Sequence, residues 1–152
     1  MNEAAAVITA LGSSFTAVAA GFAALQVRVA KKELVLLEQQ ARTAFEDDLS
    51  REYRTIVADL PAEAFYEDVE LPLGPEMRKA LYRYFDLSNE QLFLASSERI
   101  NGKTEKQWRD GIKGNITRLP TFKAAWAEIA ARVPQDFFED LRRLVPPGPA
   151  RD

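Results

Sequence analysis

A long uncharged run lies near the N-terminus of the chain. Residues 4–27 hold no acidic or basic side chain, and nine of these 24 residues are alanine. An α-helix of that length spans about 36 Å, enough to cross a hydrocarbon core about 30 Å thick. Alanine favours insertion only weakly compared with Leu, Ile, Phe or Val. The run predicts a transmembrane anchor over residues 1–30, with an alanine-rich helix buried in a soluble bundle as the alternative.

The charges that flank this run predict its orientation. Arg28, Lys31 and Lys32 follow it, whereas Glu3 precedes it. Basic residues gather on the cytoplasmic side of membrane helices. We therefore expect a single-pass protein of the cell inner membrane, with its N-terminus outside and its C-terminal domain cytoplasmic. A cleaved signal peptide is disfavoured because no basic side chain precedes the run.

Small residues recur inside the run. Ser13, Ala17 and Gly21 are spaced four residues apart, which places them on one face of a helix. Such a stripe lets two membrane helices approach closely. It suggests a partner helix, either in a homo-oligomer or in another protein.

Residues 31–60 are predicted to form an amphipathic juxtamembrane helix that continues from the anchor. No proline or glycine interrupts the chain between Val27 and Leu60, and Pro61 ends the segment. Apolar positions recur at steps of three and four residues, at Leu34, Leu37, Ala41, Phe45, Leu49, Tyr53, Ile56 and Leu60. This spacing predicts a coiled-coil face.

Residues 61–146 have the pattern of a small helical bundle. Residues 61–75 are expected to form a connector with one helical turn. Pro75 suits the first turn of a helix that runs to about Ile100. Asn101-Gly102 predicts a stop and a turn.

Three more helices are expected after that turn. Thr104 with Gln107 forms a capping box, which predicts a helix start. Pro120 and Pro134 open two further helices. The tail, residues 147–152, has no core-forming residues and is expected to be flexible.

Two glycines lie inside the helix that follows Thr104. Gly111 and Gly114 each weaken a helix by about 1 kcal/mol relative to alanine. A close helix crossing would account for them, and so would a ligand contact. The crossing is the commoner reason.

Composition narrows the chemistry. The chain has 152 residues, no cysteine, no histidine and a net charge of −3. These absences remove disulfides, thiolate nucleophiles, and the commonest general base and metal ligand. The net charge gives no reason to expect nucleic acid. We therefore expect no catalytic residue, metal or cofactor, and we expect membrane lipid and protein as partners.

A polar stretch, residues 88–91, interrupts an otherwise apolar helix. Asn89 lies four residues after Phe85 and four before Phe93, a spacing that directs it to the interior, where it needs hydrogen-bond partners. A structural polar network with a neighbouring helix is one interpretation. The other is a small ligand pocket, and its candidate residues are Tyr84, Asn89, Glu90, Trp108 and Trp126.

Two acidic clusters are better explained by solvation than by metal binding. Glu46-Asp47-Asp48 lies on a predicted helix, where consecutive residues point in different directions. Residues 67–70 lack the glycine and the spacing of a calcium loop.

Aromatic residues from Tyr82 onward follow a recognisable pattern: YRYFDLSNEQLFL, then RI, W-x-x-G-I and P-x-F-x-x-A-W. This pattern resembles a family of small bacterial proteins of unknown function with an N-terminal transmembrane helix, a coiled segment and a helical C-terminal domain. The likeness covers roughly residues 80–130 and implies a membrane anchor, but no activity. The matching positions are Tyr84, Phe85, Asn89, Glu90, Leu94, Ile100, Trp108, Gly111, Ile112, Pro120, Phe122 and Trp126.

Together these features predict an all-α, membrane-anchored protein, an accessory or regulatory subunit of a membrane-associated assembly. An exposed apolar strip should then remain on residues 34–60. One alternative is a soluble all-α module that oligomerises through its alanine-rich helix, which requires protein to cover Val7, Leu11, Phe15, Val18 and Phe22. Another is an enzyme with a carboxylate-based pocket around Asn89 and Glu90, which requires a strongly perturbed acid.

Overall fold

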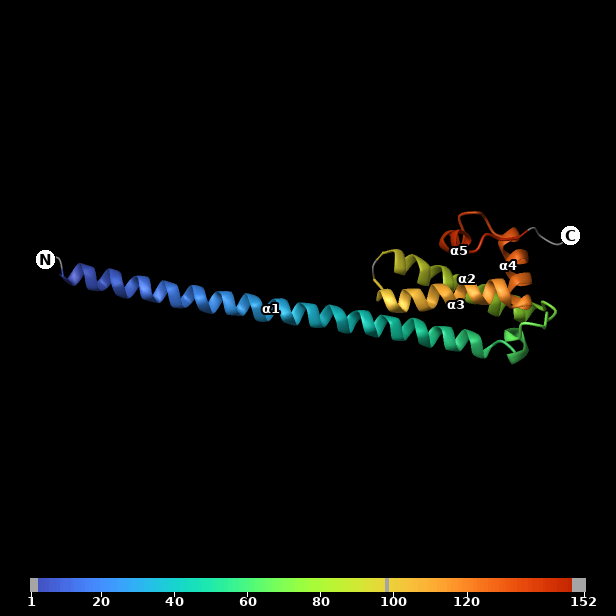
Figure 1. Cartoon of the computed structure of the whole chain (residues 1–152), viewed down its shortest axis with the longest axis horizontal. Coiled ribbons are helices and arrows are strands. Elements are labelled where there is room, and N and C mark those ends of the chain that lie inside the picture. Colours follow the sequence, from blue (N-terminus) through green and yellow to red (C-terminus); the bar gives the residue numbers. More distant parts are fainter. Residues whose placement is uncertain (1–2, 98, 149–152) are drawn as a thin grey trace. The chain divides into compact units, whose positions relative to one another are not determined.

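All regular structure in the described chain is helical, which confirms the all-α prediction. The computed structural model describes the backbone of residues 3–97 and 99–148, and the side chains of residues 22, 23, 25–97 and 99–148. Its elements (Figure 1) are α1 (Glu3–Ala58), η1 (Ala62–Phe65), α2 (Pro75–Ser96), α3 (Gly102–Arg118), α4 (Pro120–Arg132) and α5 (Glu139–Leu144). The chain divides into two compact units, residues 1–41 and residues 42–152.

The first helix, α1, runs without interruption for 56 residues. This length agrees with the absence of proline before Pro61 and of glycine between Val27 and Leu60. In the part of the chain that is described, no helix carries an apolar stretch long enough to cross a membrane. The side chains of residues 1–21 and 24 lie outside that part. Most of the predicted anchor therefore lies outside the described side chains. Val7, Leu11, Phe15 and Val18, which protein would cover in the soluble alternative, also lie outside them.

Unit 42–152 is a bundle built around α2. This helix packs against α3, α4 and α5, and Figure 1 shows α2 and α3 side by side. Pro75 occupies the start of α2 and Pro120 the start of α4, as predicted, because proline fixes the backbone angle that a first helical turn needs. The most deeply buried side chains are aromatic or aliphatic and include Leu81, Tyr84, Phe85, Phe122 and Trp126.

The apolar stripe of α1 is covered over part of its length. Leu49 and Ile56 are buried in the core of unit 42–152, together with Leu60 just after the helix. Leu34 and Leu37, which belong to unit 1–41, are 69% and 62% exposed. The expectation of an exposed strip over all of residues 34–60 is therefore wrong for its second half, because the domain's own helices cover it.

The start of α3 differs from the prediction. Its N-cap is Asn101, whose side chain accepts a hydrogen bond from the backbone N–H of Lys103 at 2.9 Å. Thr104 is not a cap, and its hydroxyl donates to Glu46 instead, at 2.9 Å. Asn101-Gly102 thus marks the turn as expected, but the N-cap of the new helix lies three residues earlier than the capping box predicted. The helix before it ends at Ser96, short of Ile100.

The last helix starts later than Pro134. Residues 133–138 are not helical, and α5 begins only at Glu139. Phe138 adopts the left-handed region, with φ at 59°, a conformation that is costly for a residue with a side chain. Its ring is buried against Tyr82 and Trp126, with centroids 5.4 and 5.8 Å away. Burial of this ring offsets the backbone cost and overrides the helix-start signal of the proline.

Neither Gly111 nor Gly114 of α3 lies at a close helix crossing. A methyl group added at Gly111 would meet nothing within 4 Å. At Gly114 it would meet only the side chain of Arg118, which belongs to the same helix. The predicted packing role of these glycines is therefore wrong.

Candidate functional site

The five candidate pocket residues come from three helices. Helix α2 carries Tyr84, Asn89 and Glu90, while α3 carries Trp108 and α4 carries Trp126. Tyr84 and Trp126 are buried, Trp108 is partly buried, and Glu90 is exposed. The five side chains therefore differ widely in their access to solvent.

Aromatic rings fill the space between the two buried candidates. Tyr84 packs edge-on against Phe122 with ring centroids 4.9 Å apart, and Trp126 packs against Phe85 at 5.1 Å. The indole N–H of Trp126 donates to the backbone carbonyl of Val145 at 2.9 Å. These contacts make Tyr84 and Trp126 parts of one packed core.

The hydroxyl of Tyr84 is a buried polar group with a defined partner. It accepts a hydrogen bond from Nδ2 of Asn115, at 2.9 Å. Burial raises the pKa of Tyr84 to about 12, and the hydrogen bond from Asn115 only partly opposes that rise. The phenol therefore stays protonated at physiological pH, which makes it unsuited to act as a general base.

Asn89 links two helices. Its side-chain oxygen accepts a hydrogen bond from the backbone N–H of Leu141 at 3.1 Å, in the first turn of α5. The first N–H groups of a helix have no partner inside it, so Asn89 caps α5 from α2. Glu90 points to solvent. Neither residue lines the surface depression that the structure contains.

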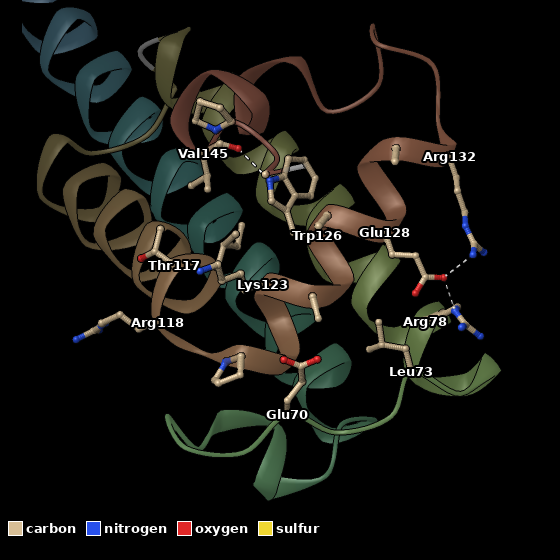
Figure 2. A pocket seen from close by; sticks show the side chains of 17 residues that line it. Glu70, Leu73, Arg78, Thr117, Arg118, Lys123, Trp126, Glu128, Arg132 and Val145 are labelled. Atoms are coloured by element: carbon tan, nitrogen blue, oxygen red, sulfur yellow. Dashed lines mark hydrogen bonds and ion pairs between the residues drawn. The ribbon is translucent and has the colours of Figure 1, made fainter. Parts of the chain in front are cut away.

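That depression runs along α4 and has a volume of about 970 Å³ (Figure 2). Its walls come from α4, from α2 at Arg78, from the end of α3, from the connector at Glu70 and Leu73, and from the C-terminal stretch at Val145. Trp126 is the one predicted site residue that lines it, among the residues described. Sequence spacing could not reveal it, because the segments that line it come from residues 70 to 148 of the chain.

Charges along the depression are largely matched. Glu128 accepts a hydrogen bond from Arg78 at 2.8 Å and forms an ion pair with Arg132 at 2.9 Å, and Figure 2 shows it between them. Lys123 and Arg118 lie at the left of the view. The lining of the depression includes three alanines of α4, Ala124, Ala127 and Ala131. The depression is thus lined by small apolar side chains and by charged side chains that are largely paired.

No group of acids resembles a metal centre in the described chain. Three or more Asp or Glu residues never gather closely enough there to hold an ion. Within the predicted acidic triplet, Glu46 accepts hydrogen bonds from Asn101 and Thr104, and Asp48 pairs with Arg51 at 2.7 Å. The solvated interpretation is thus wrong for Glu46, whose carboxylate binds the start of α3.

Besides the depression along α4, a second candidate interaction surface lies on α1. Large apolar side chains are exposed on both sides of the basic cluster Arg28, Lys31 and Lys32, which is itself exposed. These apolar residues are Phe22, Leu25, Val27, Val29, Leu34, Val35, Leu36 and Leu37. So dense a group of exposed apolar side chains is typical of a surface that meets lipid or protein.

Comparison of the chain with protein-family models, curated proteins and solved structures found no match. The family resemblance drawn from the sequence motifs therefore remains an expectation.

Proposed function

We propose that the chain is a single-pass membrane protein whose unit 42–152 is a cytoplasmic interaction domain. It would serve as an accessory or regulatory subunit of a membrane-associated assembly, without catalytic activity or cofactor. The observation that carries this proposal is the exposed apolar surface of α1. Phe22, Leu25 and Val27 are each at least 60% exposed at the end of an uncharged run that begins at residue 4.

A bilayer is a suitable environment for such a segment. A helix satisfies its backbone hydrogen bonds internally, which is the requirement for any segment in hydrocarbon. The exposed apolar side chains would then be covered by lipid. Arg28, Lys31 and Lys32 would lie at the cytoplasmic headgroups, which orients the N-terminus outward.

The interaction role rests on unit 42–152. Its core is closed by its own aromatic rings, and its hydrogen-bonded polar residues hold helices together. The depression along α4 offers a surface of small apolar and charged side chains. We therefore assign partner docking to this domain and localisation to α1.

One observation favours a second candidate. Leu34 and Leu37 lie beyond the basic cluster, where the hydrocarbon of a bilayer would no longer reach. A soluble module that oligomerises through α1 would cover them with protein.

Alkaline carbonate washing of bacterial membranes separates the two candidates. The full-length protein should stay in the washed pellet. The variant Ala17→Arg/Ala20→Arg should appear in the supernatant, because a charged residue in the middle of a membrane helix costs about 3 kcal/mol. The control Val35→Arg adds a charge outside the run and should stay in the pellet. Release of the full-length protein as a defined oligomer would favour the soluble module.

The orientation has its own test, made simple because the chain contains no cysteine. A membrane-impermeant maleimide should label Asn2→Cys in intact spheroplasts. It should label Lys103→Cys only after lysis. The reverse pattern would contradict the outward N-terminus.

A further inference from the structure

Three basic side chains lie on one face of α1. Lys31 and Lys32 follow Arg28 at three and four residues, the spacing that places helical side chains next to one another. All three are exposed, as is Val35, which belongs to the same face. The three positive charges therefore form one cationic face, residues 28, 31 and 32, on a single turn of helix.

The acidic residue nearest in sequence, Glu33, does not share this face. Glu33 is one residue after Lys32 and two after Lys31, so it projects about 100° and 200° away from them. No acidic residue precedes the face within the described part of α1 after Glu3. Glu38 returns to the side of Lys31, but it lies seven residues further on, about 10 Å along the axis. The positive charge of the face is therefore not cancelled within its own turn of helix.

The position of the cationic face along α1 identifies its partner. Exposed Phe22, Leu25 and Val27 come directly before it. A helix with this order places its apolar part among acyl chains and its cations at the level of the lipid phosphates. The rest of the protein supplies no comparable attraction, since residues 42–152 carry 17 basic and 20 acidic side chains.

We propose that the cationic face binds the phosphate groups of anionic lipids in the leaflet where α1 emerges. This inference rests on the proposed membrane anchor and adds lipid selectivity to it. Each Lys or Arg next to an anionic leaflet strengthens binding about fivefold, so three together give on the order of a hundredfold preference over a zwitterionic surface.

Quenching by labelled lipids tests the selectivity in the full-length protein. A fluorophore on Val35→Cys reports from the cationic face, because the chain has no other cysteine. The protein is reconstituted in phosphatidylcholine vesicles that contain a small fraction of spin-labelled lipid. That lipid is either phosphatidylglycerol or phosphatidylcholine, with the nitroxide near the top of the acyl chain. Half-quenching should need a lower fraction of labelled phosphatidylglycerol, by about fivefold if one cation is engaged and by on the order of a hundredfold if all three are.

Variants assign the effect to the three residues. Arg28→Gln/Lys31→Gln/Lys32→Gln should abolish the preference while leaving the helix intact, because glutamine has a helix propensity close to that of lysine. The control Arg99→Gln/Lys103→Gln/Lys113→Gln removes the same charge from exposed positions of unit 42–152. This control should keep the preference for phosphatidylglycerol. High salt should weaken the preference of the parent protein.

The outcomes separate this proposal from the membrane anchor. Equal quenching by both lipids would overturn the selectivity and leave insertion standing, whereas no quenching by either would overturn insertion itself. A preference for phosphatidylglycerol that survives in the triple glutamine variant would overturn the proposed lipid selectivity of the cationic face. Self-quenching between labelled chains without lipid preference would assign this face to a second copy of the chain.

Discussion

Glu46 in α1 accepts a hydrogen bond from the backbone N–H of Asn101, with 2.7 Å between Oε1 and the amide nitrogen. Its other oxygen accepts the hydroxyl of Thr104. A carboxylate in this place satisfies a donor at the start of α3 and interacts favourably with the positive end of the helix dipole. One side chain thus joins the C-terminal part of α1 to the turn between α2 and α3.

Replacing this carboxylate should weaken the domain. Glu46→Ala should lower the free energy of unfolding by about 1–2 kcal/mol, the usual cost of losing a helix-end hydrogen bond. Urea denaturation of the full-length protein in mild detergent, followed by tryptophan fluorescence, measures the change. The exposed neighbour Asp47 provides the control, and Asp47→Ala should change stability by less than about 0.5 kcal/mol. Equal effects of the two substitutions would contradict a specific role for Glu46.

Asn89 should act mainly on the local stability of α5. Asn89→Ala removes the acceptor for the N–H of Leu141 and should speed amide exchange across residues 139–144. Asn89→Asp keeps an acceptor oxygen next to a helix N-terminus and should retain most of the protection. Hydrogen exchange with mass spectrometry measures both, with the exposed substitution Glu90→Ala as the control. Unchanged exchange of α5 in Asn89→Ala would show that this hydrogen bond contributes little.

Much of the fold follows from local signals in the sequence. Pro75 and Pro120 begin α2 and α4, and the spacing of apolar residues along α2 and α4 identifies their buried faces. These signals involve neighbours within one or two helical turns, which a single sequence displays directly. For that reason the helical class and the starts of α2 and α4 could be predicted.

Contacts between distant segments could not be predicted in the same way. The partners of Glu46 lie 55 and 58 residues away, so an acidic triplet on a helix looked like a solvated face. The start of α5 depends on burial of Phe138 against rings from two other helices. The depression along α4 needs the connector and the C-terminal stretch to meet. Tertiary packing determines the partners of Glu46, the start of α5 and the depression along α4. The local spacing of residues does not indicate which distant segments will meet.

Gly111 offers a stabilising substitution. It lies inside α3 with open space around its missing side chain and without a positive φ angle. Gly111→Ala should therefore raise the free energy of unfolding by about 1 kcal/mol, because alanine loses less backbone entropy in a helix. Gly114→Ala should gain less, since its methyl group would displace the side chain of Arg118. Urea denaturation compares the two, and a loss of stability in Gly111→Ala would mean that this face of α3 is covered by a partner.

Alkaline pH should destabilise the domain through Tyr84. Its pKa rises from 10.0 to about 12 in the folded protein, chiefly because burial disfavours the phenolate. The unfolded chain therefore loses this proton first. The contribution of Tyr84 is complete below pH 10 and is lost as the pH rises from about 10 to about 12. A shift of that size corresponds to about 2–3 kcal/mol.

Tyr84→Phe isolates this effect. At neutral pH the variant should be about 1 kcal/mol less stable, because Asn115 loses its phenol acceptor. Above pH 10 it should lose stability less steeply than the parent protein, so the difference between them narrows. Urea denaturation at several pH values between 8 and 11 measures both slopes. Tyr66→Phe changes an exposed ring and should keep the parent slope. A parallel decline of the parent and Tyr84→Phe would mean that the buried phenol does not set the alkaline limit.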